Sequence, residues 1–293
     1  MSRYRFIAAE KACYPLALLC RVLAVARAGY YAWRQRGLSQ RAAFDAALTK
    51  ELIRLHGASR QTYGVPRLHA DVKAAGWRVG RKRVARLLRL AGLHGVSRRR
   101  VTPRTTITDP SAAVAPNVLR RQFTAAAPDR AWVGDITYLP TGEGWLYLAS
   151  LVDVYSRRVV GWALADHLRT ELALEALQLA LGQRHPEAGT LVHHTDRGCQ
   201  YTARAYQAVL ALQGITPSMS RAGNCYDNAM AESFNGTIKG ELVAQAHWAT
   251  REEARAAVFE WITVFYNRQR RHSSLGYQTP VDFETSHGIT EAA

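Results

Sequence analysis

The sequence predicts an α/β protein in which a mixed five-stranded sheet is flanked by helices and is preceded by a small all-helical region. Three observations lead to this expectation. Hydrophobic residues make up 48% of the 293 residues and charged residues 21%, which is typical of a folded globular chain. From residue 129 onward, short β-rich runs alternate with helical patterns. Before that point the patterns are helical and the charge is strongly basic.

The surplus of basic residues is the clearest signal in the composition. Lys and Arg number 39 against 23 Asp and Glu, which gives a net charge of +16 at pH 7. Residues 72–108 contain eleven Lys and Arg and no Asp or Glu. Such a surplus favours a polyanionic partner, and nucleic acid is the leading class. Composition alone leaves open a soluble protein with a solvated basic surface.

A tight turn is expected to join two short helices in the front half. Pro66 suits the first turn of a helix over residues 67–75, and this helix stops at Gly76. A second helix follows over residues 81–91 and is ended by Gly92.

The second of these helices has separate apolar and basic faces. Its apolar stripe consists of Val84, Leu87, Leu88 and Ala91. Lys82, Arg86 and Arg89 lie on another face, and we expect these three side chains to contact DNA. Two short helices of this kind fit a helix-turn-helix. The alternative is an ordinary helical hairpin with a solvated arginine face.

The chain is expected to have four parts. Residues 1–50 form an N-terminal helical region, in which residues 15–33 show a weaker helical pair. Residues 51–100 form the helix-turn-helix domain. Residues 101–127, rich in Thr, Pro and Ala, are interpreted as a linker, and residues 128–285 as the folded core.

The core alternates strands and helices in the order βββαβαβα. Strands are expected over residues 132–139, 145–154, 158–164, 190–196 and 215–220. Helices are expected over residues 170–181, 203–213 and 228–242, with a last amphipathic helix over residues 251–267. This order implies a mixed sheet with helices on its faces, which is the arrangement of a ribonuclease-H-like fold.

The cysteines and the apolar runs bear on the compartment. The four cysteines (Cys13, Cys20, Cys199 and Cys225) form no CxxC pair, which suits a reducing compartment. The apolar stretch at residues 16–26 is broken by Arg21 and is too short to span a bilayer. It also lacks a small-residue cleavage site. We therefore expect a cytoplasmic protein without a membrane partner.

Three acidic residues occur where a charge is costly. Asp135 lies inside the first β-rich run, Asp196 ends the fourth, and Glu232 lies in the helix over residues 228–242. Charges in a buried sheet are unfavourable unless something compensates them, and a divalent cation would do so. In a sheet of this order the first and fourth strands pair, which sets Asp135 beside Asp196. The helix with Glu232 then crosses the same edge.

That helix has one polar face, formed by Asn228, Glu232, Asn235 and Lys239. The adjacent apolar face can pack on the sheet, so the polar face is expected to point at a substrate. We expect Asn228, Asn235 and Lys239 to contact DNA, with Lys239 near a phosphate. For Lys239 the alternative is a solvated helix residue.

Three carboxylates in these positions suit two Mg²⁺ or Mn²⁺ ions. Two such ions about 4 Å apart clamp the attacking and leaving oxygens of an in-line phosphoryl displacement. We therefore predict Asp135, Asp196 and Glu232 as the catalytic and metal-binding residues. A zinc site is not expected, because the available ligands lack short paired spacings; these ligands are His193, His194, Cys199 and Cys225.

The spacing and the flanking residues resemble those of the three-carboxylate (DDE) transposases of insertion sequences and of retroviral integrases. Thirty-five residues separate Asp196 from Glu232, as in the D…D(35)E pattern of that superfamily. The matching segments are Trp132-x-Gly-Asp-Ile-Thr-Tyr138, His194-Thr-Asp-Arg-Gly-Cys-Gln-Tyr201, Ser220 to Phe234, Lys239, and Tyr266 to Pro280, with Tyr63-Gly64, Lys82-Arg83-Val84 and Leu87-Leu88 in front. The similarity extends from about residue 14 to residue 284. The chain resembles the second-frame, catalytic protein of a two-frame insertion element.

The resemblance implies a transposase, which cuts DNA at the ends of a mobile element and joins it to a target. It implies Mg²⁺ or Mn²⁺ as cofactor, the terminal repeats and target DNA as partners, and a homo-oligomer. It also implies a first-frame companion protein, or a fusion with it. The chain has no sustained heptad pattern, and only about thirteen residues separate Met1 from what looks like the middle of a DNA-binding region.

Two other functions stay open at this point. The first is a helix-turn-helix DNA-binding regulator with an inactive core, although an idle core has no physical reason to keep three mutually repelling acids. The second is a structure-specific nuclease of the same fold, which only a strand-transfer assay separates from a transposase.

Overall fold

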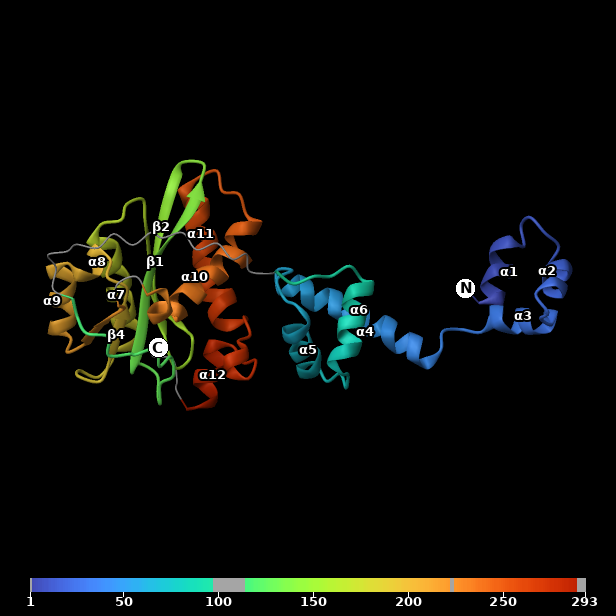
Figure 1. Ribbon diagram of the computed structural model, residues 1–293, viewed down its shortest axis with the longest axis horizontal. Helices are drawn as coiled ribbons and strands as arrows, with labels where there is room; N and C mark the ends of the chain where they lie inside the picture. The colour runs from blue at the N-terminus through green and yellow to red at the C-terminus, as the bar shows by residue number, and fades with distance from the viewer. Residues whose placement is uncertain (1, 97–113, 222–223, 289–293) are drawn as a thin grey trace. The chain divides into compact units, whose positions relative to one another are not determined.

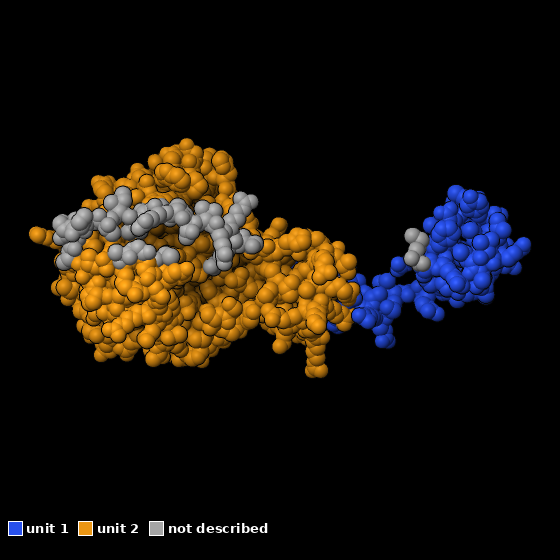
Figure 2. Space-filling model, in the orientation of Figure 1, with its two compact units in different colours: residues 1–54 blue, residues 55–293 orange. Residues whose placement is uncertain are grey.

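The computed structural model describes residues 2–96, 114–221 and 224–288. The chain divides into two compact units, residues 1–54 and 55–293 (Figure 2). The segment expected to be a linker, residues 101–127, lies outside the described residues as far as residue 113. Its remaining part, residues 114–127, contains no helix or strand.

The first unit is built on three short helices: α1 (Arg3–Glu10), α2 (Leu16–Val22) and α3 (Arg27–Gln35). Ile7, Leu19 and Tyr30 are buried at their centre. Two of the helices form the pair expected over residues 15–33, whereas α1 was not anticipated. The helix α4 (Gln40–Ala58) runs across the boundary between the units.

Among the described residues, no single helix is long and apolar enough to cross a membrane. By length and composition alone, the bent pair Leu16–Val22 and Arg27–Ala58, with 107° between them, would suffice together.

The helix-turn-helix pair is present as expected, as α5 (Val65–Ala74) and α6 (Arg81–Leu90). The predicted apolar stripe of α6 is buried at Val84, Leu87 and Leu88. The turn after each helix contains a glycine with a left-handed backbone, Gly76 at φ 86° and Gly92 at φ 68°. Both glycines therefore end their helices as the sequence predicts.

The sheet has the expected five strands: β1 (Ala131–Thr141), β2 (Gly144–Asp153), β3 (Val159–Ala165), β4 (Val192–Thr195) and β5 (Thr216–Met219). Their spatial order is β3-β2-β1-β4-β5. The first three strands form an antiparallel meander, and β4 and β5 add to it in parallel. The predicted pairing of the first and fourth strands is confirmed.

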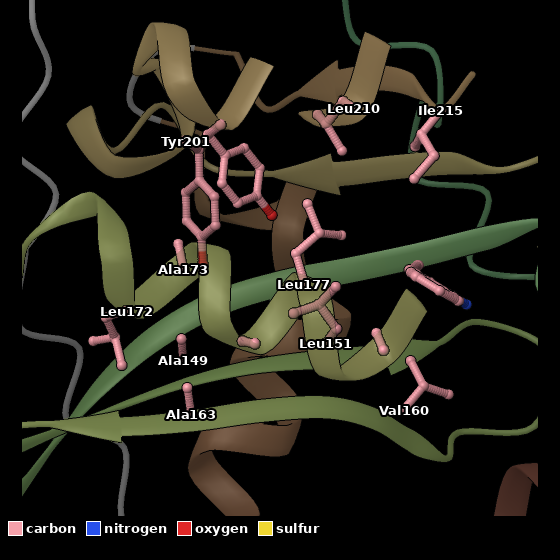
Figure 3. Close-up of a cluster of buried hydrophobic side chains, with 14 of the residues drawn as sticks. Ala149, Leu151, Val160, Ala163, Leu172, Ala173, Leu177, Tyr201, Leu210 and Ile215 are labelled. Atoms are coloured by element: carbon pink, nitrogen blue, oxygen red, sulfur yellow. The ribbon is translucent and has the colours of Figure 1, made fainter. Parts of the chain in front are cut away.

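Helices cover both faces of this sheet (Figure 1). On one side lie α7 (Thr170–Arg184), α8 (Cys199–Thr202) and α9 (Arg204–Leu212), and α10 (Ala229–Glu241) and α11 (Arg251–Glu260) lie on the other. Leu172, Ala173 and Leu177 of α7 pack on strand residues such as Ala149, Leu151 and Val160 (Figure 3).

The contact of β3 with α7 depends on a glycine. A Cβ atom at Gly161 would collide with the carbonyl oxygen of Ala176 and with Ala180. Only the absence of a side chain at this position lets the edge strand approach the helix this closely.

Two helices differ from their expected form. The helix expected over residues 228–242 begins as a 3₁₀ turn, Cys225–Asn228, before α10. The helix expected over residues 251–267 is α11 followed by a π-helix, Trp261–Tyr266. The wider turn buries Trp261, Phe265 and Tyr266, and the ring of Tyr266 meets Phe234 of α10 at 5.1 Å. Aromatic packing thus accounts for the change of helix type.

The remaining elements are short. They are the 3₁₀ turns Val243–Gln245 and Ser273–Leu275 and the helix α12 (Pro280–Ser286). The helix α12 was not predicted, although its signals are in the sequence. Thr279 accepts a hydrogen bond from the Asp282 amide, and Pro280 occupies the first turn.

Candidate active site

Asp135 lies in the middle of β1, next to the strand that leads to Asp196. The parallel register pairs Val133 with His194, and the same register continued along both strands sets Asp135 opposite Asp196. A Cβ atom at Gly134 would lie 2.9 Å from Cε1 of His193. A side chain at the position before Asp135 would therefore press on the His193 ring.

Asp196 follows β4 directly. The strand ends at Thr195, one residue earlier than predicted. The Gly198 amide donates a 2.9 Å hydrogen bond to Oδ1 of Asp196, so the carboxylate is held by the turn after the strand. Asp196 is half-buried, as is Asp135.

Glu232 lies in the first turn of α10 and is exposed. The N-terminal end of a helix favours a negative charge, which suits a glutamate there. The helix packs on β1 and β2, and its neighbours Ala231 and Phe234 are buried. The glutamate therefore stands at the rim of the core, as its helical face predicts.

The three carboxylates lie within electrostatic reach of one another. Burial raises the pKa of Asp135 to about 8, and repulsion from Asp196 and, more weakly, from Glu232 adds to the shift. The pKa of Glu232 is also raised, first by burial and then by Asp196. Burial lowers the pKa of Lys239, and the charge of Asp135 opposes this shift, so the ammonium group lies near the same carboxylate.

The donor set fits a divalent cation in its chemistry. Three carboxylates repel one another here, and a cation between them would remove the repulsion. In addition, Oδ1 of Asn235 is buried without a hydrogen-bond partner beside Asp135. Among the described residues no three His, Cys, Asp or Glu side chains form a ready metal cluster. Water and substrate phosphate would have to complete the coordination, as Mg²⁺ prefers.

The two asparagines expected to contact DNA are buried in the protein instead. Nδ2 of Asn235 donates a 2.9 Å hydrogen bond to Oδ2 of Asp135. Nδ2 of Asn228 donates to the carbonyl oxygen of Gly134 at 3.2 Å. Both contacts are directed at the β1 segment around Asp135, because α10 packs on this strand.

The two residues directly before α10 have different roles. Asn228 occupies the N-cap position of α10 but accepts no hydrogen bond there. The Asp227 carboxylate is fully buried and binds the side chains of Arg121, Arg221 and Asn117. These ion pairs offer the carboxylate stronger partners than a helix end does.

The neighbouring histidines have structural partners. His193 lies 2.8 Å from the Tyr206 hydroxyl, and burial lowers its pKa to about 3. His194 bridges Ser218 at 2.8 Å and Ser220 at 3.2 Å. Burial lowers the pKa of His194 as well, so a neutral imidazole ties β4 to β5 just before Asp196.

The far end of α10 is fixed by an ion pair that the sequence did not suggest. Arg270 donates two 2.7 Å hydrogen bonds to the carboxylate of Glu241, and both side chains are buried. Arg67 of α5 lies 3.5 Å from the same carboxylate. The segment after the π-helix thus holds the helix that carries Glu232. Arg270 belongs to the matching segment Tyr266 to Pro280, but the sequence did not show that its partner is Glu241.

The basic residues predicted to contact DNA in the front half lie on α6. Lys82 and Arg89 are exposed, and Arg86 is half-buried. The buried side of this helix is the apolar stripe, and Lys82 and Arg89 lie on its exposed side.

Comparisons with known proteins agree with this architecture. Two family models described as "Integrase core domain" match residues 125–225 and 213–280, and one described as "HTH-like domain" matches residues 43–101. The "Insertion element IS600 uncharacterized 31 kDa protein" of Shigella sonnei is 43% identical over 90% of this chain and 97% of its own length. The "Transposase InsF for insertion sequence IS3A" of Escherichia coli (strain K12) is 41% identical over 96% of this chain and 98% of its own.

Solved structures with some likeness include two retroviral proteins. A chain of the simian T-cell lymphotropic virus intasome, in complex with PP2A regulatory subunit B56 gamma, has a TM-score of 0.48 at 16% identity, over 83% of this chain and 78% of that chain. The HTLV-2 integrase catalytic core domain, in complex with magnesium, has a TM-score of 0.42 at 18% identity, over 54% of this chain and 97% of that chain.

Proposed function

The chain belongs to the IS3 family of DDE transposases, and from this premise we propose that it cuts DNA at the ends of an insertion element and transfers the cut strand to target DNA in a metal-dependent reaction. The observation that carries the proposal is the electrostatic coupling of Asp135, Asp196 and Glu232. Acidic neighbours that raise the pKa of Asp135 and of Glu232 are unfavourable in an idle core. They are useful where cations and a phosphodiester must meet.

In this proposal Asp135, Asp196 and Glu232 hold divalent cations, Mg²⁺ or Mn²⁺ and two per site. When bound, such ions lower the pKa of the attacking oxygen and stabilise the charge on the leaving oxygen. The carboxylates arrive from two adjacent strands and one helix end.

The side chains around the triad have positioning roles in the proposal. Asn235 fixes the rotamer of Asp135 through its 2.9 Å hydrogen bond, and its free Oδ1 is an acceptor for a water in the site. Asn228 fixes the start of α10 against β1 through the Gly134 carbonyl. Lys239 interacts electrostatically with Asp135, and in this proposal its ammonium group holds a DNA phosphate.

DNA is also bound away from the triad in this proposal. The exposed basic residues Lys82 and Arg89, with Arg86, contact the phosphates of the element ends through α6. Because two ends must be brought together, we propose that the chain acts as a homo-oligomer with a first-frame companion protein or as a fusion with it.

The test is an incubation with DNA that carries the element's terminal repeats and a labelled target, in Mg²⁺, with both nicked and joined products scored. Asp135→Asn, Asp196→Asn and Glu232→Gln are each expected to abolish both products and to retain DNA binding. The exposed acids Asp166 and Glu175 provide matched controls, Asp166→Asn and Glu175→Gln, which should leave both products unchanged. A triad variant that still nicks at the wild-type rate would falsify the assignment. Nicking without joining would indicate a nuclease instead.

A further inference from the structure

A basic pocket lies beside the turn that leads into α10. Its volume is about 410 Å³, and it is lined by Asn117, Arg120, Arg121 and Arg221. The first three come from the segment ahead of β1, and Arg221 follows β5. These residues are far apart in the sequence, so the pocket is a product of the fold.

One buried carboxylate binds two of these arginines. Asp227 accepts hydrogen bonds from Nε and Nη2 of Arg221 at 2.9 and 3.0 Å, and from Nε of Arg121 at 2.8 Å. Nδ2 of Asn117 donates to it at 3.0 Å. The hydrogen bonds from Arg221 and then Arg121 hold the pKa of Asp227 far below its usual range, so the carboxylate stays charged. It is occupied by donors from within the protein.

Two guanidinium groups of the pocket, those of Arg120 and Arg121, have N–H donors that Asp227 does not use. Arg121 uses only Nε on Asp227, and Arg120 has no side-chain partner within the part of the chain that the structure describes. Three guanidinium groups with one carboxylate leave two positive charges in an open pocket. Planar guanidinium forks match the oxygen geometry of a phosphate group.

The backbone that presents Arg120 and Arg121 is strained and firmly held. Their φ angles are 47° and 65°, a left-handed region that costs non-glycine residues on the order of 1–3 kcal/mol. Oδ1 of Asn117 accepts a 2.8 Å hydrogen bond from the Arg120 amide, and Oγ of Ser218 accepts one from Val118 at 2.9 Å. Strain that is held in place by its surroundings is typical of binding sites.

The pocket shares its supports with the triad. Ser218 also binds His194, two residues before Asp196. Asn228, the neighbour of Asp227, donates to the carbonyl oxygen of Gly134, next to Asp135. The residues that hold the pocket are thus connected by hydrogen bonds to the segments that carry Asp135 and Asp196.

We propose that this pocket binds a phosphodiester of the DNA strand on which the active site works, and so fixes the position of that strand without reading its sequence. The proposal rests on the proposed function. An exposed aromatic ring favours a nucleic acid strand over free phosphate: Tyr226 is 68% exposed, and the guanidinium of Arg121 lies 5.6 Å from its ring centroid. Basic groups beside an aromatic face are a common surface for DNA strands.

The test measures the salt dependence of DNA binding in EDTA, so that no strand is cut. The affinity for a short duplex of arbitrary sequence is determined by fluorescence anisotropy over a range of salt concentrations. Arg120→Gln removes a charge that has no partner in the described chain, and it should reduce the slope of log K against log salt by about 0.9, the value for one phosphate contact. Arg120→Lys should keep the slope.

Arg204, exposed on α9 and not among the residues that line the pocket, supplies the matched control Arg204→Gln, which should keep the wild-type slope. An unchanged slope for Arg120→Gln, or an equal loss for Arg204→Gln, would overturn the proposal. Competition by inorganic phosphate at constant ionic strength is measured in parallel. If Arg120→Gln changes only this competition, the pocket is a free-phosphate site and the proposal is wrong.

The same samples are assayed for nicking of element ends in Mg²⁺. If the slope of Arg120→Gln is unchanged while the wild-type protein nicks DNA, the pocket proposal fails and the proposed function stands. A wild-type protein that neither binds nor nicks DNA would overturn both.

Discussion

At the scale of single residues, the carboxylate site combines repulsion with tight positioning. The pKa of Asp135 is raised to about 8 by burial and by its acidic neighbours, whereas an aspartate in an unfolded chain has a pKa of about 3.9. A folded pKa above the unfolded value means that the charged form destabilises the fold. Without metal, the contribution of Asp135 to the stability of the fold therefore rises as the pH falls from about 8 towards 4.

Asp135→Asn should remove this effect. In EDTA at pH 8 we expect the variant to unfold at a higher temperature than the wild-type protein, and the difference should disappear near pH 4. Mg²⁺ at pH 8 should stabilise the wild-type protein more than the variant. Thermal unfolding followed by circular dichroism measures all three, with the exposed Asp166→Asn as control. A variant that is less stable than wild type at pH 8 contradicts this account of Asp135.

Asn235 acts on Asp135 through a single hydrogen bond. Asn235→Ala should therefore raise the Mg²⁺ concentration needed for half-maximal nicking by about 10- to 100-fold, the usual effect of losing a group that orients a metal ligand. DNA affinity in EDTA should stay the same. An unchanged Mg²⁺ requirement, together with weakened DNA binding, would return Asn235 to the role of a DNA contact.

At the scale of elements, α10 is held at both ends. Its first turn is tied to β1 by Asn228, and its last turn is tied by Glu241 to Arg270. Arg270→Met leaves the Glu241 carboxylate buried without its main partner, which should cost about 3–5 kcal/mol of unfolding free energy. Urea titration gives the value.

A double variant separates the ion pair from the packing. Glu241→Gln removes the carboxylate charge that Arg270→Met leaves buried without its partner. The double variant should therefore recover a large part of the lost unfolding free energy. If the two losses simply add, Arg270 stabilises the fold by packing alone and the ion pair does not hold α10.

The sequence predicted the elements better than their contacts. Alternating β-rich and helical patterns were enough to predict all five strands and the pairing that sets Asp135 opposite Asp196. The π-helix at Trp261–Tyr266 was missed, because the aromatic packing against α10 that accompanies it is a long-range contact, which the local pattern does not contain.

The polar face of α10 shows the same limit at the site. Helical spacing correctly placed Asn228 and Asn235 on one side with Glu232. It did not predict that β1 lies close enough to accept hydrogen bonds from both side-chain amides. The partners of Asp227 were likewise invisible, because Arg121 is distant in the chain. Long-range pairs of polar side chains depend on the packed fold, and local patterns do not contain them.

At the scale of the whole molecule, the net charge of +16 favours DNA binding through phosphates. We expect the basic face of α6 to form part of the DNA-binding surface. Lys82→Ala, Arg86→Ala and Arg89→Ala should each reduce the salt slope of DNA binding by about one unit if each contacts a phosphate. Arg169→Ala, at an exposed position before α7, is the control. Unchanged slopes for all three would make this face a solvated surface.

The central claim is that the three carboxylates place divalent cations at the scissile phosphate, and replacing the leaving oxygen by sulfur tests it most directly. Sulfur binds Mg²⁺ poorly and softer ions such as Mn²⁺ better. Nicking is measured on element ends with a 3′-oxygen or a 3′-sulfur at the cleaved bond. The account predicts that both ions support cleavage of the oxygen substrate, while the sulfur substrate is cut in Mn²⁺ and hardly at all in Mg²⁺. Equal cleavage of the sulfur substrate in both ions would contradict a metal contact with the leaving group.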